Sequence, residues 1–116
     1  MDLKLGDWIK IIDELNNIFC LRVEELITPF IFKFEDELYN LKEIKTISIE
    51  KWTVQPGEIC WFWSENDTIP TLGSFTNIHR EDFHNTYTAI IKGNFCELFD
   101  YCEPYCPHIK PTLLKD

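Results

Sequence analysis

The stretch Ile59-Cys60-Trp61-Phe62-Trp63 gives the clearest indication of the fold class of the second half. It follows a Pro56-Gly57 turn signal and is rich in β-branched and aromatic side chains, which predicts a buried strand. Successive side chains of a strand point to opposite faces of its sheet, so Trp61 and Trp63 share one face while Cys60 and Phe62 share the other. Two alternatives stay open for the tryptophan face: core on both sides of the strand, or an exposed patch that contacts another protein.

Stretches of similar character lie on both sides of this strand. Further short strands are expected near residues 5–11, 18–23, 30–34, 44–50, 70–78, 87–91 and 95–101. Many short strands separated by turns predict a mainly β fold, a small barrel or a rolled sheet, with α+β as the alternative. The competing helices are residues 8–15, whose apolar side chains also fall at helical spacing, and residues 36–41. A change of texture at Trp52 indicates two small packed β modules, residues 1–50 and 51–116, or one continuous domain.

Charge restricts the possible partners. The 116 residues include 20 acidic and 11 basic side chains, so the formal net charge is −9. Duplex phosphates repel such a surface, and the basic side chains form no stripe, which argues against direct nucleic-acid binding. No run approaches the roughly 18 apolar residues of a membrane span, and Met1-Asp2-Leu3-Lys4 does not begin a signal peptide. We therefore expect a cytoplasmic protein whose acidic surface suits a basic protein partner.

Three segments of the second half carry a resemblance. They are residues 52–63, with Pro56-Gly57-Glu58 followed by Cys60-Trp61-Phe62-Trp63, then Pro70-Thr71-Leu72-Gly73-Ser74-Phe75, and finally Cys102-Glu103-Pro104-Tyr105. Together they resemble a module of small phage and prophage accessory proteins, a family without an established activity. The opening Leu3-Lys4-Leu5-Gly6-Asp7-Trp8-Ile9 is similar to that of other small mobile-element proteins, which are barrels of the Src-homology-3 type. The resemblance implies an accessory protein of a mobile element and names no chemistry.

A cysteine–histidine tail is the one candidate metal site. Cys96, Cys102, Cys106 and His108 could supply the four N and S ligands that zinc prefers. Their spacing departs from paired Cys-x2-Cys, and Cys60 is a possible substitute ligand. The alternatives are reduced cysteines, buried or near the surface, and a disulfide between Cys102 and Cys106. The reduced form is the expectation, with no metal and no cofactor.

Catalytic motifs are missing from the sequence. His79, Glu81, Asp82 and His84 fall in one polar loop, where an acid–base pair is conceivable. No Gly-x-Ser-x-Gly, phosphate-binding glycine loop or His-Glu-x-x-His accompanies them. We therefore expect no enzyme activity, and we interpret this loop as a binding surface.

Clustered carboxylates suggest how the protein acts. The residues expected to contact a partner are Glu24, Glu25, Glu35, Asp36 and Glu37, the loop residues His79, Glu81, Asp82 and His84, and the aromatic side chains Trp61 and Trp63. Negative charge steers an encounter with a basic surface, and exposed aromatic rings add affinity. The hypothesis is a stoichiometric inhibitor of a host nucleic-acid-handling defence complex, of the CRISPR–Cas or restriction type. The partner is a host protein or ribonucleoprotein, with no direct nucleic-acid or membrane contact.

Two other functions remain as alternatives. One is a structural or assembly homo-oligomer that associates through the Trp61 and Trp63 face. The other is a small zinc-binding module built on the cysteine–histidine tail.

Overall fold

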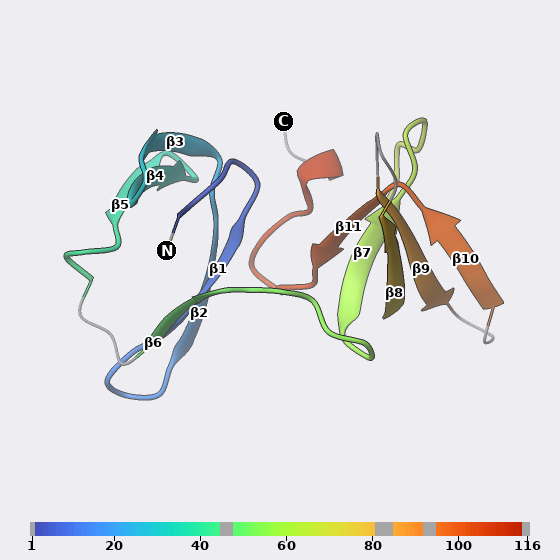
Figure 1. Ribbon diagram of the computed structural model, residues 1–116, viewed down its shortest axis with the longest axis horizontal. Helices are drawn as coiled ribbons and strands as arrows, with labels where there is room; N and C mark the ends of the chain where they lie inside the picture. The colour runs from blue at the N-terminus through green and yellow to red at the C-terminus, as the bar shows by residue number, and fades with distance from the viewer. Residues whose placement is uncertain (1, 45–47, 81–84, 92–94, 115–116) are drawn as a thin grey trace. The chain divides into compact units, whose positions relative to one another are not determined.

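A computed structural model describes residues 2–44, 48–80, 85–91 and 95–114 (Figure 1). The chain divides into an N-terminal unit, Met1–Thr53, and a C-terminal unit, Val54–Asp116. In the described residues, eleven strands form three antiparallel sheets, and the only helical element is the short 3-10 turn η1 (Thr112–Leu114). The mainly β prediction is confirmed, and the α+β alternative is wrong for this part of the chain. The described strands close no barrel, because each sheet keeps two separate end strands.

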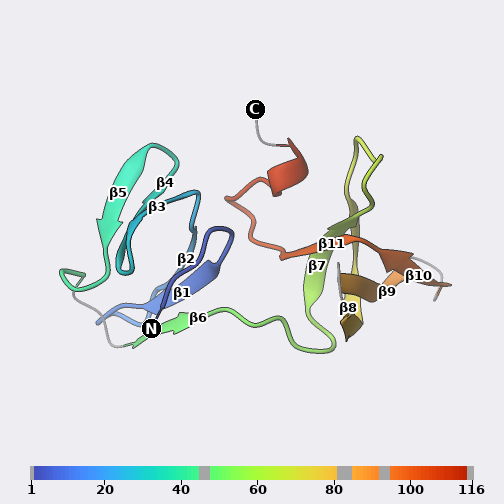
Figure 2. The same ribbon diagram turned by 45° about the horizontal axis from the view of Figure 1, so that its top comes forward.

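The N-terminal unit holds two three-stranded sheets (Figure 2). The first sheet consists of β1 (Trp8–Ile12), β2 (Ile18–Arg22) and β6 (Ser48–Lys51), in the order β2-β1-β6. The second sheet consists of β3 (Glu25–Thr28), β4 (Ile31–Phe34) and β5 (Glu37–Asn40), in the order β3-β4-β5. Each sheet has buried apolar side chains, among them Ile9 and Leu21 of the first and Phe32 of the second. Burial of such side chains stabilises the unit by roughly 1.5–3 kcal/mol each.

The two competing helices do not form. Residues 8–12 are strand β1, and the chain turns at Asp13, whose carboxylate accepts hydrogen bonds from the backbone N–H of Leu15 (2.9 Å) and Asn17 (2.8 Å). This side chain satisfies backbone donors in a turn, which ends the apolar periodicity that favoured a helix. The helix over residues 36–41 is also wrong, because Asp36 has a φ of 65° and β5 follows it.

One five-stranded antiparallel sheet forms the C-terminal unit, in the order β10-β9-β8-β7-β11. Its strands are β7 (Ile59–Trp63), β8 (Thr71–Arg80), β9 (Asn85–Ile91), β10 (Phe95–Phe99) and β11 (Tyr101–Pro104). The register of β8 with β9 shifts between Phe75 and Asn77. Gly73 of β8 allows close packing, since a Cβ there would lie 3.1 Å from the Ile90 carbonyl oxygen.

The core of the C-terminal unit lies on one face of this sheet. Its buried members are Cys60, Phe62, Phe75, Ala89 and Phe99. Phe62 is fully buried, and its ring lies 5.4 Å from that of Phe99, a distance typical of favourable aromatic pairs. The predicted alternation along β7 is therefore confirmed, because Cys60 and Phe62 both face this core.

Truncation of Phe62 tests how much the unit depends on this cluster. We expect Phe62→Ala to lower the free energy of unfolding by about 3–5 kcal/mol, because it removes a fully buried ring and leaves a cavity. Ile59→Ala, on the same strand but with its side chain 52% exposed, should lower it by less than about 1 kcal/mol. Urea denaturation measures both values, and similar losses in the two variants would contradict this placement of the core.

Candidate functional site: the open face of the C-terminal sheet

The register of the C-terminal sheet defines a second face, opposite the core. Directly paired residues of antiparallel strands point to the same face, so every residue aligned with Trp61 or Ile59 belongs to it. We call this surface the open face. Its members are Ile59, Trp61, Trp63, Leu72, Ser74, Asn77, His79, Thr86, Thr88, Ile90, Cys96, Leu98, Tyr101 and Glu103.

Four apolar side chains on the open face are exposed. Ile59 is 52% exposed, Leu72 44%, Ile90 38% and Leu98 63%, and these four residues come from four adjacent strands. Residues between them are small or neutral, and the face has one carboxylate, Glu103, which accepts hydrogen bonds from the backbone and the hydroxyl of Thr112. Apolar side chains exposed on adjacent strands of one nearly uncharged face, in an otherwise acidic chain, are typical of a protein-contact site.

The two tryptophans lie at the β7–β11 end of the open face. Trp63 is only 7% exposed and stacks on Tyr101, with ring centroids 5.6 Å apart. Trp61 is half-buried, and its ring lies 5.9 Å from that of Tyr105. Neither alternative from the sequence holds for both rings, because Trp63 is largely covered by its neighbours and Trp61 keeps part of its surface accessible.

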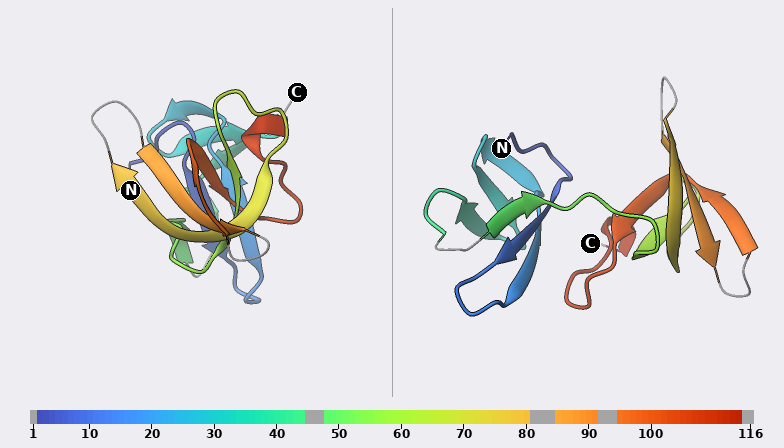
Figure 3. Two further views of the ribbon diagram at one scale, coloured as in Figure 1. Left: turned by 90° about the vertical axis from the view of Figure 1, so that its right-hand side faces the viewer. Right: turned by 60° about the horizontal axis from the view of Figure 1, so that its bottom comes forward.

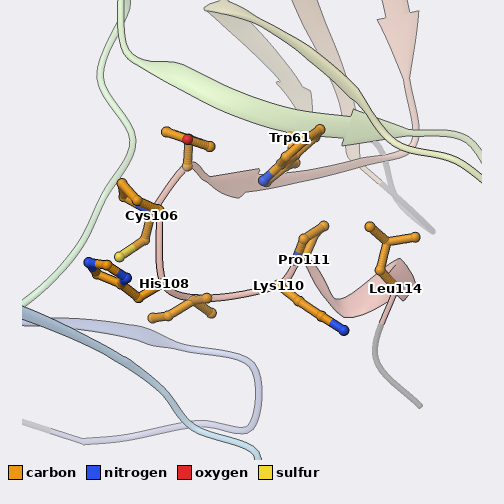
Figure 4. A pocket seen from close by; sticks show the side chains of 9 residues that line it. Trp61, Cys106, His108, Lys110, Pro111 and Leu114 are labelled. Atoms are coloured by element: carbon orange, nitrogen blue, oxygen red, sulfur yellow. The ribbon is translucent and has the colours of Figure 1, made fainter.

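A cavity of about 380 Å³ adjoins Trp61. Its lining consists of Trp61, Leu114 and the segment 105–111. Figure 4 shows the Trp61 indole above Pro111, with Cys106 and His108 across from Pro111. Most of the lining is apolar or aromatic, which is typical of a surface that receives an apolar side chain. The cavity therefore adds depth to the Trp61 end of the open face.

The cysteine–histidine tail does not converge. Cys96 lies exposed on the open face of β10, whereas Cys102 faces the core from β11, at the opposite end of the sheet (Figure 3). Within the residues that the structure describes, no group of three or more His, Cys, Asp or Glu side chains is placed to hold a metal ion. All five cysteines are free thiols, so the alternative disulfide between Cys102 and Cys106 is wrong.

Cys102 has a different neighbour, which sequence spacing could not reveal. A hydrogen bond with Cys60, followed by burial and the nearby negative charge of Glu103, raises the pKa of the Cys102 thiol. The Cys60 thiol in turn donates to the Glu58 carbonyl oxygen at 3.8 Å. The pairing of β7 with β11 creates this contact, and it keeps Cys102 protonated and poorly nucleophilic.

The predicted carboxylates have different environments. Glu24 is largely buried: it pairs with Arg22 at 2.9 Å and accepts the backbone N–H of Glu35 at 2.8 Å. Arg22 is 5% exposed and lies 5.4 Å from the centroid of the Trp8 ring. Sequence reasoning missed this buried ion pair, although an arginine two positions before a glutamate on adjoining strand ends is a weak signal for it. Glu24 thus links Arg22 to the backbone of the β4–β5 turn, and its role in partner contact stays a prediction.

Three exposed carboxylates form the tip of the β4–β5 hairpin. Glu35 and Asp36 have φ values of 51° and 65°, the left-handed region that a tight two-residue hairpin turn requires. Glu37 follows and accepts a hydrogen bond from the Tyr39 hydroxyl at 3.1 Å; burial and this bond raise the pKa of Tyr39. Nearby on β3, the exposed Glu25 lies 3.8 Å from Lys33. The tip therefore presents negative charge to solvent.

The predicted histidine loop is described only in part. His79 is exposed and belongs to strand β8, which extends to Arg80, so the interpretation of this position as a loop is wrong. Glu81, Asp82 and His84 lie outside the described residues. Their role in contact stays a prediction.

A scan against protein-family models, a search of curated proteins and a search of solved structures each found no match to this chain. Among the residues that the structure describes, no helix has the length and apolar character needed to cross a bilayer.

Replacement of Glu35 by glycine separates charge from backbone strain. We expect Glu35→Gly to raise the free energy of unfolding by roughly 1 kcal/mol, because glycine adopts a φ of 51° without steric penalty. Glu25→Gly, inside strand β3, removes the same charge and should destabilise by about 0.5–1 kcal/mol. Thermal and urea unfolding report both changes. A loss of stability in the Glu35 variant would contradict the turn conformation.

Thiol alkylation tests the placement of the cysteines. At pH 8 we expect iodoacetamide to modify the exposed Cys96 first, and Cys60 and Cys102 last. Cys60 is fully buried, and the raised pKa of Cys102 keeps it out of the reactive thiolate form. Mass spectrometry of digested, time-resolved samples gives the order, and denatured protein serves as the control in which all five react alike. Equal rates for Cys96 and Cys102 in the folded protein would overturn the assignment.

Proposed function

We propose that this chain is a non-catalytic protein-binding accessory that acts stoichiometrically through its open face. The observation that carries the proposal is the exposure of Ile59, Leu72, Ile90 and Leu98 on one nearly uncharged sheet surface. Burying apolar surface contributes about 25 cal/mol per Å², so a partner that covers these side chains gains affinity without desolvating charges.

Charge defines the class of partner within this proposal. The net charge of −9 and the exposed carboxylates Glu25, Glu35, Asp36 and Glu37 favour a protein or ribonucleoprotein with a basic surface. Proteins that handle nucleic acids commonly have basic surfaces, because they contact phosphates. With the sequence resemblance to phage accessory proteins, this supports an inhibitor of a host defence complex, of the CRISPR–Cas or restriction type, that acts in the cytoplasm of the host cell.

We infer that the two units are small β modules of the Src-homology-3 or rolled-sheet type. The two three-stranded sheets of the N-terminal unit support the rolled form more closely than a closed barrel.

A homo-oligomer is the second candidate, and the same surface favours it. Two acidic chains repel each other over most of their surfaces, but the open face would bring few like charges together if two copies stacked there. Light scattering on the purified chain separates the candidates. A monomer supports a different protein as the partner, and a dimer that dissociates when Ile90 is replaced by lysine supports self-association.

Capture with matched variants tests the proposed function. The bait is the purified full chain, compared with a Leu72→Lys/Ile90→Lys variant and a Leu5→Lys/Leu15→Lys control, in which the same charge is added at exposed leucines of the N-terminal unit. We expect the control to retain the host protein captured by the unmodified chain and the open-face variant to lose it, with at least a tenfold weaker affinity when measured with the purified partner, because the added ammonium groups would be buried unpaired.

Two further measurements complete this test. The association rate with the purified partner should fall as salt rises, since steering by exposed carboxylates is screened. Equal capture by the two lysine variants, or an empty eluate even after crosslinking, would contradict binding through the open face.

A further inference from the structure

The edge strand β10 leaves one row of backbone groups without a strand partner. It is the terminal strand in the order β10-β9-β8-β7-β11, and Figure 3 shows it as the outermost arrow of this sheet. Its residues Phe95–Phe99 pair with β9 in five consecutive positions without a register shift. No other strand among the described residues pairs with its outer side. Such an edge is a template for an added strand.

The side chains of β10 are exposed on both faces of the sheet. Phe95 is 67% exposed on the core side, and Leu98 is 63% exposed on the open face, next to the accessible Cys96. Proteins usually protect an edge with lysines, a proline or a bulge, and Phe95–Phe99 has none of these. An added strand would therefore find apolar neighbours above and below it.

The opposite edge of the same sheet is protected. β11 ends at Pro104, which has no N–H to offer. The chain then returns to this strand (Figure 1): Glu103 of β11 accepts hydrogen bonds from the backbone N–H and the hydroxyl of Thr112, and Cys106 forms a bridge with Ile109. The two edges of one sheet thus differ, and β10 is the one open to pairing.

Glu97 selects the charge of the added strand. It lies exposed at the centre of β10, and its alignment with Ala89 places it on the core side, flanked by Phe95 and Phe99. A second copy laid antiparallel with Glu97 at the centre of the pairing would set two carboxylates against each other, which is destabilising. A lysine or arginine at that position would instead be attracted, so the charge favours a different, basic segment over self-pairing.

We propose that β10 binds an extended segment of the partner protein, with alternating apolar and basic residues, as a sixth strand of this sheet. The inference rests on the proposed function and names the mode of binding. Backbone hydrogen bonds to β10 give the affinity, the apolar side chains of the segment extend the open face beyond Leu98, and its basic side chains pair with Glu97.

A peptide experiment on the full chain tests this mode. The probe is a capped nine-residue peptide of alternating valine and lysine, with a valine–glutamate peptide and a backbone N-methylated valine–lysine peptide as comparisons. The unmodified protein should bind the valine–lysine peptide, and N-methylation should weaken binding by about tenfold or more, because it removes several backbone hydrogen bonds. Hydrogen exchange should slow at residues 95–99 only when the unmethylated peptide is bound.

A charge reversal separates edge pairing from general attraction between opposite charges. Glu97→Lys should weaken binding of the valine–lysine peptide by roughly fivefold and make the valine–glutamate peptide the preferred ligand. Glu14→Lys makes the same charge change at an exposed turn of the N-terminal unit and should leave the preference unchanged. Binding that ignores N-methylation, protection away from residues 95–99, equal effects of the two reversals, or no binding of the valine–lysine peptide would overturn the proposal.

The peptide experiment can fail while the capture experiment succeeds, so the two proposals are tested separately. A partner lost by the Leu72→Lys/Ile90→Lys variant, combined with unprotected β10 amides, would leave the open-face function standing and reject strand addition. Protection of β10 in protein without peptide, together with a dimer by light scattering, would reject the basic segment and identify a second copy as the occupant.

Discussion

The pairing of β7 with β8 on one side and β11 on the other is the constraint on which the C-terminal unit depends. It places the fully buried Cys60 and Phe62 on the core side and leaves Ile59 and Trp61 on the other. Because side chains alternate with a period of two, a one-residue slip would exchange the faces and bury the wrong set. The fully buried Phe62 makes such a slip unfavourable, so the same packing that stabilises the sheet also fixes which residues reach a partner.

The sequence predicts the strands well where the pattern is local. The alternation along β7, the turn at Pro56-Gly57 and the mainly β class all follow from neighbouring residues. The sequence pattern does not predict contacts that depend on the pairing of strands far apart in the chain. The contact between Cys60 and Cys102 requires the register of β7 with β11, which no spacing in the sequence encodes. The zinc hypothesis assumed that nearness along the chain meant nearness in space, and the sheet separates Cys96 from Cys102.

Charge counts are equally limited, because they do not distinguish neighbours with different environments. Glu24 and Glu25 are adjacent in the sequence, yet Glu24 lies beside the buried Arg22 and Glu25 faces solvent. Which of the two is buried depends on the edge of β3 and on the hairpin tip, where Glu35 supplies a backbone N–H to Glu24. A buried ion pair of this type adds little net stability, since desolvation offsets much of the attraction.

The distribution of charge links the fold to the proposed function. Electrostatic attraction acts over about 8–10 Å at physiological salt, so carboxylates can steer an encounter without belonging to the contact itself. Apolar contact acts only where surfaces touch, and it is strongest where no charge must be desolvated. A chain with a net charge of −9 that keeps one sheet face nearly free of charge separates these two tasks. An additional acidic side chain on the open face would increase solubility but weaken apolar contact with a partner. This gives a physical reason why the residues between the apolar side chains of the open face, Ser74, Asn77 and Thr88, are neutral.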